Sequence, residues 1–206
     1  MSLTAHEVHA LKRAPSMEGV LPAFHERWSP RSFAAREVSA EVLKKLFEAA
    51  RWTASSYNEQ PWRFIVGLRG DGTWEKIFAA LGEFNKNWAK TAPVLILTAA
   101  HTRFSHNGTE NRHALYDLGA ASSYLTLEAA ALGLAAHQMA GFDPEAARKA
   151  FGVPAEYLIG TVIALGYLGE PTALGDAGLI KSETAARARK PLDEIVFSEW
   201  DKAAGI

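Results

Sequence analysis

The 206-residue chain contains no cysteine. Without a thiol it can form no disulfide, no thiolate metal site and no iron–sulfur cluster, and a cysteine nucleophile is excluded. A chain without disulfides fits a reducing compartment.

Excess charge of one sign and long apolar runs are also missing. The 22 basic and 23 acidic residues give a net charge of −1, which predicts neither a nucleic-acid nor a membrane partner. The longest apolar segments, 94–100 and 129–136, are far shorter than the ~18 residues of a membrane span. The first twenty residues lack the apolar core of a secretory signal. We therefore expect a cytoplasmic protein.

Several catalytic and nucleotide-binding motifs are absent from the sequence. It has no G-x-G-x-x-G, Walker A, G-x-S-x-G or H-E-x-x-H pattern. Its seven histidines are scattered without the spacing of metal ligands, which predicts no metal site. If the chain is an enzyme, its difficult chemistry belongs to an organic cofactor held by Arg, Ser, Asn and backbone donors.

What the sequence does contain indicates one globular domain, because 48% of its residues are apolar and no linker divides it. Hydrophobic periodicity and capping residues predict α/β or α+β architecture. The expected elements are a helix from Ser39, a strand over 62–68, a helix over 73–81, a strand over 93–100, a helix over 111–132, a strand over 134–139, a helix from Asp143 and a strand over 159–168. The helix over 111–132 is apolar nearly all round, so we expect it in the core or in a subunit interface.

The ends of the chain are expected to differ from its middle. Residues 1–25 form an N-terminal extension with the first helix. Residues 171–206 form a polar arm with an apolar tip at 195–197. An arm of this kind usually packs on something, and a partner subunit is a reasonable candidate.

The first chemistry-bearing segment is Arg27-Trp28-Ser29-Pro30-Arg31. Its two guanidinium groups bracket a hydroxyl, a combination that binds phosphate oxygens. A solvated basic turn is the more common explanation of such a segment taken alone. The cluster Arg187-Ala188-Arg189-Lys190 is by itself a charge run, but a dianionic phosphate would use cations from both segments.

The second segment is the polar loop that precedes the strand over 62–68. Ser55, Ser56, Asn58 and Gln60 offer groups that both donate and accept hydrogen bonds, as the edge of a heterocycle such as flavin requires. An ordinary loop capped by Asn and Ser fits equally well.

Six motifs in order, from about residue 26 to 197, closely resemble the nitroreductase family of flavin mononucleotide (FMN) enzymes. They are R-x-S-x-R-x-F from Arg27, S-S-x-N-x-Q-P-W from Ser55, N-x-x-W from Asn85, A-L-G-L from Ala131, G-F-D from Gly141 and R-K-P-L-x-E-I-V from Arg189. The resemblance implies an α+β fold with a mixed β-sheet flanked by helices. It also implies a homodimer with FMN at the interface and C-terminal arms packed on the partner.

The resemblance assigns roles to individual residues. Arg27, Trp28, Ser29 and Arg31 match the segment that holds the FMN phosphate and ribityl chain, and Arg187 and Arg189 match cations that reach the same phosphate. Asn85 matches a residue near the pyrimidine ring, and Ser55, Ser56, Asn58 and Gln60 match the loop that reaches the flavin of the opposite subunit. Ala140 and Gly141 match the pair whose backbone lies near flavin N5. Some members carry glutamate where Ala140 stands, so only the backbone role is carried over.

The implied activity is hydride transfer from NADH or NADPH, through flavin N5, to a nitroaromatic, quinone or related conjugated acceptor by a ping-pong mechanism. No catalytic side chain is expected. Two other functions stay open: a flavin-binding or sequestering module with little turnover, and a specialised flavin dehydrogenase of the same fold. The sequence does not identify the acceptor or the preferred nicotinamide.

Overall fold

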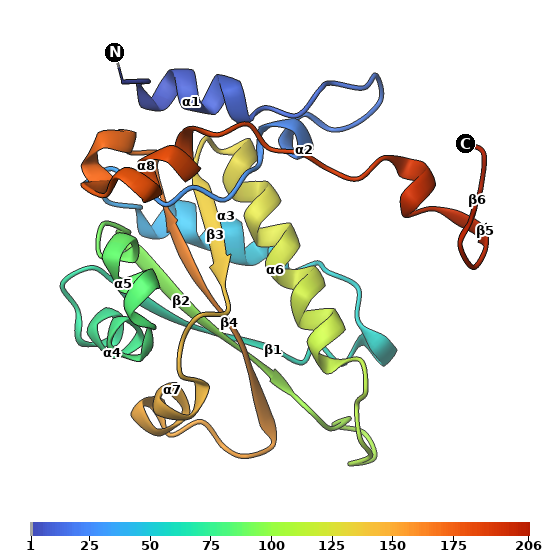
Figure 1. Ribbon diagram of the computed structural model, residues 1–206. Helices are drawn as coiled ribbons and strands as arrows, with labels where there is room; N and C mark the ends of the chain where they lie inside the picture. The colour runs from blue at the N-terminus through green and yellow to red at the C-terminus, as the bar shows by residue number, and fades with distance from the viewer. Residues whose placement is uncertain (1) are drawn as a thin grey trace.

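A four-stranded sheet forms the centre of the computed structural model, which describes residues 2–206 (Figure 1). Its strands are β1 (Trp62–Leu68), β2 (Val94–His101), β3 (Ala135–Met139) and β4 (Tyr157–Gly166), in the order β1-β2-β4-β3. Each neighbouring pair is antiparallel. The predicted α+β class is confirmed, but the sheet is antiparallel throughout residues 2–206 and not mixed as predicted. Consecutive neighbours such as β3 and β4 are joined at one end of the sheet, which makes them run in opposite directions.

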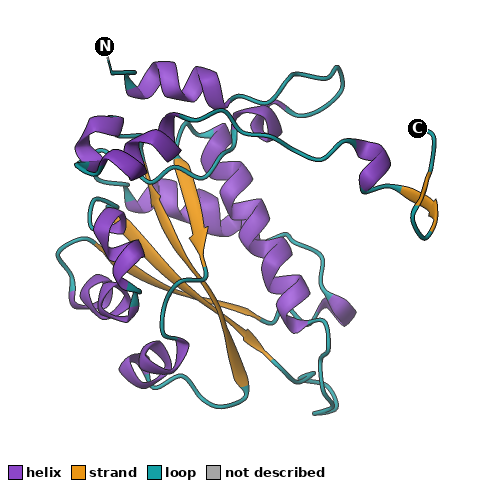
Figure 2. Ribbon diagram, in the orientation of Figure 1, coloured by secondary structure: helices purple, strands orange, loops and turns teal. Residues whose placement is uncertain are grey.

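Helices cover both faces of this sheet (Figure 2). Leu95 and Leu97 of β2 pack into one core with helices α4 (Gly72–Ala80), α5 (Glu83–Ala89) and α7 (Pro144–Phe151). Ile96 and Ala100 point the other way, into a core with α3 (Ala40–Arg51) and α6 (Ala114–Ala131). Because side chains alternate along a strand, a continuously apolar β2 supplies both cores.

The helix starts follow the predicted capping residues. Ser39 Oγ accepts a hydrogen bond from Val42 N at 3.3 Å at the start of α3. Asp143 Oδ1 accepts from Glu145 N and Ala146 N at 2.9 and 3.0 Å at the start of α7. These bonds satisfy backbone donors that the first turn of a helix leaves unpaired.

Helix α6 is buried on one face only. Leu118, Ala121 and Leu125 lie in the core, while Tyr116 is 78% exposed and Tyr124 is 47% exposed. The expectation of burial in the core is confirmed for the inner face. The outer face remains apolar and uncovered in a single protomer.

Near its ends the chain folds into further short elements. Helices α1 (Ala5–Lys12) and α2 (Pro22–Glu26) form the N-terminal extension. The 3-10 turn Ser56–Asn58 precedes β1, and Pro171–Leu174 and α8 (Ala177–Thr184) follow β4. Residues 171–184 thus fold on the body of the protein, and the extended arm begins only after α8.

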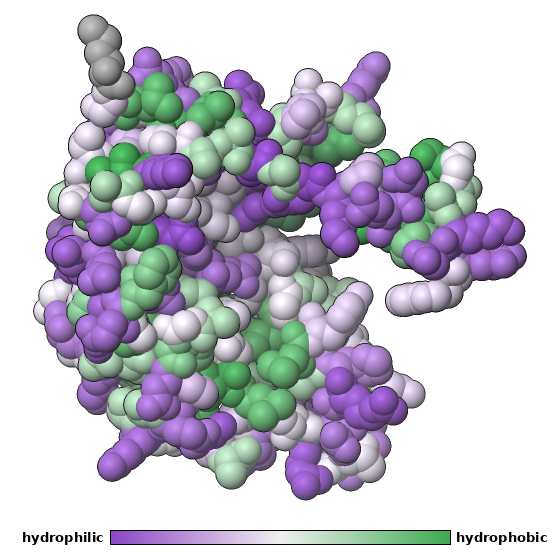
Figure 3. Space-filling view, in the orientation of Figure 1, coloured by the Kyte–Doolittle hydropathy of each residue, from purple (hydrophilic) through white to green (hydrophobic). Residues whose placement is uncertain are grey.

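The arm stands clear of the body and carries both polar and apolar residues at its tip (Figure 3). It contains the 3-10 turn Leu192–Glu194 and a small hairpin of β5 (Phe197–Glu199) and β6 (Lys202–Ala203). Trp200 at the hairpin turn is 92% exposed. No helix within residues 2–206 has the length and apolar character needed to cross a bilayer.

Candidate functional site

Three arginines from the two ends of the chain converge. Arg187 donates hydrogen bonds to the carbonyl oxygens of Arg27, at 2.7 Å, and His25, at 2.8 Å. Burial and the neighbouring charge of Arg189 lower the pKa of Arg27. Burial, Arg27 and Arg189 lower the pKa of Arg187 in the same way. The structure therefore brings together the two basic segments that the sequence analysis paired, and their mutual repulsion marks a site suited to an anion.

Ser29 and Arg31 extend this cluster. Arg27 Nη1 lies 3.3 Å from Ser29 Oγ. Arg31 turns toward the ring of Phe84, 6.0 Å away, and donates to Ser182 Oγ at 3.3 Å. Its Nε is buried and has no hydrogen-bond partner within residues 2–206. A buried donor without a partner is costly, so Arg31 fits a site that a ligand acceptor completes.

Glu183 of α8 lies behind this segment. Its carboxylate accepts hydrogen bonds from Arg31 N at 2.9 and 3.0 Å and from Ser32 N at 3.1 Å. These two backbone donors are thereby occupied. An anion at the arginine cluster would be held by side chains and not by this turn of backbone. The sequence analysis missed Glu183, because its partners are ~150 positions away in the chain and no local spacing reveals them.

A second group surrounds a cavity of about 490 Å³ that Phe84, Asn85, His137, Ala140 and Gly141 help to line. Asn85 Nδ2 donates to Gly141 O at 2.8 Å, and Trp88 Nε1 donates to Asn85 Oδ1 at 3.2 Å. A Cβ at Gly141 would lie 2.6 Å from Asn85 Nδ2. The close approach of Asn85 to this backbone therefore requires glycine.

His137 connects the two groups. Its Nδ1 donates to Pro30 O at 2.9 Å, and its ring packs on Trp88 with centroids 4.6 Å apart. Burial, opposed by the hydrogen bond to Pro30 and assisted by repulsion from Arg31 and Arg27, lowers the pKa of His137 to about 4. His137 is therefore neutral at pH 7. As one scattered histidine, it gave no signal in the sequence.

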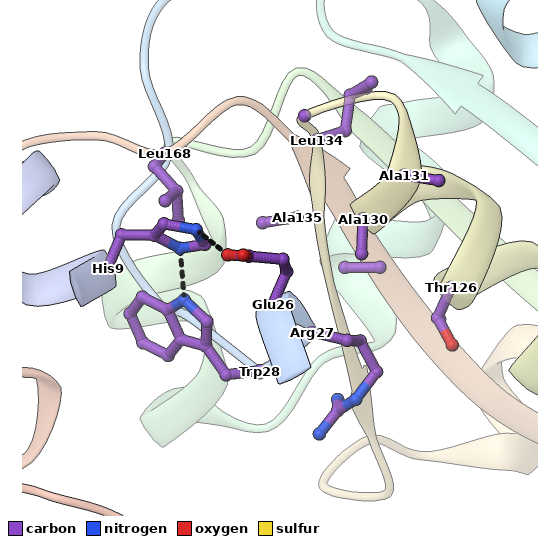
Figure 4. A pocket seen from close by; sticks show the side chains of 12 residues that line it. His9, Glu26, Arg27, Trp28, Thr126, Ala130, Ala131, Leu134, Ala135 and Leu168 are labelled. Carbon is purple, nitrogen blue, oxygen red and sulfur yellow. Dashed lines mark hydrogen bonds and ion pairs between the residues drawn. The ribbon is translucent and has the colours of Figure 1, made fainter. Parts of the chain in front are cut away.

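Behind Arg27 lies another cavity, of about 340 Å³ (Figure 4). Trp28 Nε1 donates to His9 Nδ1 at 3.2 Å, and His9 Nε2 lies 2.7 Å from Glu26 Oε2. Because Nδ1 accepts, the proton of a neutral His9 lies on Nε2 and points to Glu26. The side chain of Trp28, which the sequence analysis assigned to cofactor binding, is buried against α1 and also lines this cavity.

The predicted loop over 55–60 lies elsewhere. Ser56 N donates to Asp117 Oδ2 at 3.1 Å in the first turn of α6. Thr126, Ala130 and Ala131, near the opposite end of α6, line the cavity beside Arg27. At ~1.5 Å per residue this separation is about 15–20 Å. Within one protomer the loop does not reach the arginine cluster.

The loop is strained and carries an exposed aromatic group. Tyr57, Asn58 and Gln60 have φ of 53°, 54° and 51°, a region that costs most residues roughly 1 kcal/mol or more. Tyr57, which is 83% exposed, packs edge-on against Phe104, with centroids 5.5 Å apart, and lies 5.7 Å from the ring of His106. Both carboxylate oxygens of Glu59 accept from Ser105 N at 3.0 Å and hold the two loops together.

The described residues hold no cluster of three or more His, Asp or Glu side chains that could bind a metal ion. The candidate site consists of the arginine cluster, the cavity beside Asn85 and Gly141, and a separate loop at the far end of α6. The arginine cluster is suited to the anionic part of a ligand. The cavity beside Asn85 and Gly141 is suited to a flat part of the same ligand that forms hydrogen bonds.

Comparisons with known proteins agree on one family. A model of the nitroreductase family matches residues 25–87 and 69–167. A 15.4 kDa protein of Mycolicibacterium smegmatis is 38% identical over 143 residues, which cover 66% of this chain and 95% of that protein. An NADH dehydrogenase of Thermus thermophilus is 28% identical over 195 residues, 75% of this chain and 92% of the relative. A crystal structure described as an oxidoreductase containing FMN superposes with a TM-score of 0.82, at 31% identity, over 89% of this chain and 93% of that one.

Proposed function

The chain belongs to the nitroreductase family, and from this premise we propose that it is an FMN-dependent oxidoreductase. Its electron donor is NADH or NADPH, and its acceptor is a nitroaromatic, a quinone or a related conjugated compound. The observation that carries the proposal is the convergence of Arg27, Arg187 and Arg189 from opposite ends of the chain. The FMN named for the structural neighbour supports it.

Three features of the structure fit FMN. A phosphate monoester carries a charge of about −1.5 to −2, which would relieve the repulsion that lowers the pKa of Arg27 and Arg187. The orphaned Nε of Arg31 would gain an acceptor. Gly141 leaves room for the Asn85 amide where a Cβ would collide with it.

The residues of this chain would bind and orient the cofactor. Arg27, Ser29, Arg187 and Arg189 would hold the phosphate through their side chains, and the Asn85 amide would lie near the pyrimidine edge. The backbone at Ala140 and Gly141, which lines the cavity, would lie beside the ring. When bound, FMN supplies the hydride chemistry between donor and acceptor at N5. Phosphate binding far from the reacting atom fixes the position of the ring.

We also propose a homodimer in which each site uses both chains. The 55–60 loop and the arginine cluster of one protomer lie near opposite ends of α6, about 15–20 Å apart. The exposed apolar face of α6 and the arm with its tip at Leu192–Trp200 supply surfaces for a partner. In such a dimer, Ser55, Ser56, Asn58 and Gln60 of one protomer reach the flavin of the other.

The rings of Tyr57, Phe104 and His106 would then form an aromatic wall beside the partner's flavin. Flat conjugated acceptors pack well against such a wall. The strain at Tyr57 supports a functional reason for its placement, because neither its backbone conformation nor its exposure helps folding.

The test is the visible spectrum of the purified protein, followed by anaerobic titration with NADH and with NADPH. The proposal predicts the absorption bands of oxidised flavin, bleaching by at least one nicotinamide, and recolouring on addition of a quinone or nitroaromatic. A yellow protein that no nicotinamide bleaches would indicate a flavin-sequestering module. Turnover of one other substrate with weak nitro reduction would indicate a specialised flavin dehydrogenase. A colourless protein that cannot be reconstituted with FMN would contradict all three.

A further inference from the structure

The proposed phosphate site rests on a buried carboxylate. Glu183 is only 2% exposed, and its oxygens accept three hydrogen bonds from the backbone of Arg31 and Ser32. Four residues later the chain supplies Arg187, which binds the carbonyl oxygens of His25 and Arg27. Residues 183–187 are thus fastened along residues 25–32. The two basic segments form one unit before any anion binds.

A buried carboxylate needs a nearby positive charge. Lys12, the last residue of α1, is 8% exposed and its ammonium lies close to α8, donating to Ser182 O at 3.2 Å and lying 5.2 Å from the centre of the Trp28 ring. The charged groups that interact with Lys12 are Glu183, which attracts it, and Arg31 and Arg187, which repel it. Burial lowers the pKa of Lys12 and raises the pKa of Glu183. Two cations oppose the effect of burial on Glu183: Arg31, whose charge lowers the pKa of this carboxyl more strongly, and Lys12.

This arrangement lies outside the region that the family model matches. That region covers residues 25–167, whereas Lys12 and Glu183 come from the two flanking segments. We propose that Lys12 is a positioning residue for the arginine cluster: beside Arg31 it is a second, buried counter-charge of Glu183, and through Ser182 and Glu183 it fixes the backbone that carries Arg31. The consequence for the cluster rests on the proposed FMN function, but the Lys12–Glu183 coupling does not.

A double-mutant cycle tests the inference with four proteins: wild type, Lys12→Met, Glu183→Gln and the double variant. Methionine keeps an unbranched apolar chain beside Trp28 and removes only the charge. Lys12→Arg restores a cation. The matched control is Lys76→Met, because Lys76 also lies over an aromatic ring, that of Phe151 at 5.7 Å. Each protein is titrated with FMN by fluorescence, and its thermal unfolding without FMN is followed at pH 5 and pH 8.

We expect Lys12→Met and Glu183→Gln each to weaken FMN binding by about tenfold, the scale of one lost charge-assisted hydrogen bond. Lys12→Met should add less than about twofold in the Glu183→Gln background, since interacting residues are non-additive. Lys12→Arg should recover most of the affinity, and Lys76→Met should change nothing. Additive losses would overturn the inference, because Lys12 would then act on the ligand through its own charge.

The pH dependence of Tm distinguishes a lost charge from lost packing, because lost packing lowers Tm by the same amount at both pH values. Without Lys12 only Arg31 compensates the buried carboxylate of Glu183, which is costly at pH 8 and less so at pH 5, where the carboxylate protonates more easily. The drop in Tm caused by Lys12→Met should therefore be larger at pH 8, and it should disappear in the Glu183→Gln background. An equal drop at both pH values in both backgrounds would contradict the proposal.

Two outcomes separate this inference from the proposed function. If no variant binds FMN but the Tm coupling is present, the cofactor assignment fails and the Lys12–Glu183 pair stands. If Lys12→Met is recovered only as aggregate, the double variant should be recovered folded, because it buries no unpaired charge. Failure of Glu183→Gln to restore folding would then overturn the proposal.

Discussion

At the scale of single residues, the site depends on close contacts that permit few substitutions. Gly141 is the clearest case, because its carbonyl accepts from Gly82 N at 2.9 Å and from Asn85 Nδ2 at 2.8 Å. The backbone of Gly141 and the side chain of Asn85 lie too close together for a methyl group to fit between them. The functional requirement at this position is the absence of a side chain.

We predict that Gly141→Ala displaces Asn85 and weakens FMN binding. A Cβ would lie 2.6 Å from Asn85 Nδ2, and overpacking of this kind costs about 1–3 kcal/mol. Gly72→Ala is the matched control, because a Cβ at Gly72 meets nothing within 4 Å. Thermal unfolding and FMN titration compare the two variants. Wild-type affinity in Gly141→Ala would show that Asn85 does not need its present position.

His137 should make the protein acid-sensitive. Its pKa falls from an ordinary 6.5 to about 4 on folding, so the unfolded chain takes up a proton at a pH where the folded chain does not. Stability is therefore full above pH 6.5 and is lost as pH falls toward 4, by about 2 kcal/mol between pH 7 and pH 5. His137→Asn, whose amide can still donate to Pro30 O, should lose less stability over this range. Urea unfolding at several pH values measures the difference, and parallel curves would contradict the assignment.

At the scale of elements, local patterns predicted most of the fold. Alternating apolar residues over 62–68 predicted β1, and continuous apolar runs predicted β2 and β4. Ser39 and Asp143 predicted the starts of α3 and α7. Helices α5 and α8 were not predicted, because both are short and their sequences, EFNKNWA and AGLIKSET, carry weak periodicity. Tertiary packing of Trp88 and Leu179 fixes them instead.

The candidate site was predictable only in part for the same reason. Arginine, serine and asparagine in familiar motifs drew attention to the segments that form the arginine cluster and the cavity beside Asn85. Glu183, Lys12 and His137 act through partners that are 100 or more residues distant, and nothing in their neighbourhood distinguishes them. Trp28 lies in a predicted segment, and its indole N–H donates to His9, a contact that no local pattern reveals.

The loops over 55–60 and 101–110 should behave as one element. Glu59 accepts from Ser105 N at 3.0 Å and from Ser105 Oγ at 3.1 Å. Glu59→Ala should remove this connection and raise hydrogen exchange at residues 103–108 by roughly tenfold. Glu145→Ala, which removes an exposed carboxylate of α7, is the control. Unchanged exchange would show that the aromatic contacts of Tyr57 alone hold the loops.

At the scale of the whole molecule, a single protomer leaves apolar surface and an extended arm without contacts. It exposes aromatic side chains on the outer face of α6, extends an arm away from its body, and keeps the strained 55–60 loop apart from the arginine cluster. All three features have one explanation if two chains pair.

Light scattering should therefore give twice the 22.4 kDa chain mass. Tyr116→Lys places a charge on the exposed face of α6 and should shift the protein toward monomer while weakening FMN binding, because the loop of the partner is lost. Glu75→Lys, on α4 at the opposite face of the sheet, should leave both unchanged. A monomeric wild type with full FMN affinity would contradict the dimer.

The central claim is that arginines from both ends of the chain bind one phosphate. Titration of the cofactor-free protein with FMN and with riboflavin, which lacks the phosphate, tests it most directly. We predict that Arg27→Ala and Arg187→Ala each weaken FMN binding by about 10- to 100-fold, at ~1.5–3 kcal/mol per charge-assisted contact, and leave riboflavin binding unchanged. Arg36→Ala, whose guanidinium lies over the Tyr167 ring at 3.7 Å, is the control. Equal binding of FMN and riboflavin by the wild-type protein, or equal losses for both ligands in the variants, would contradict the claim.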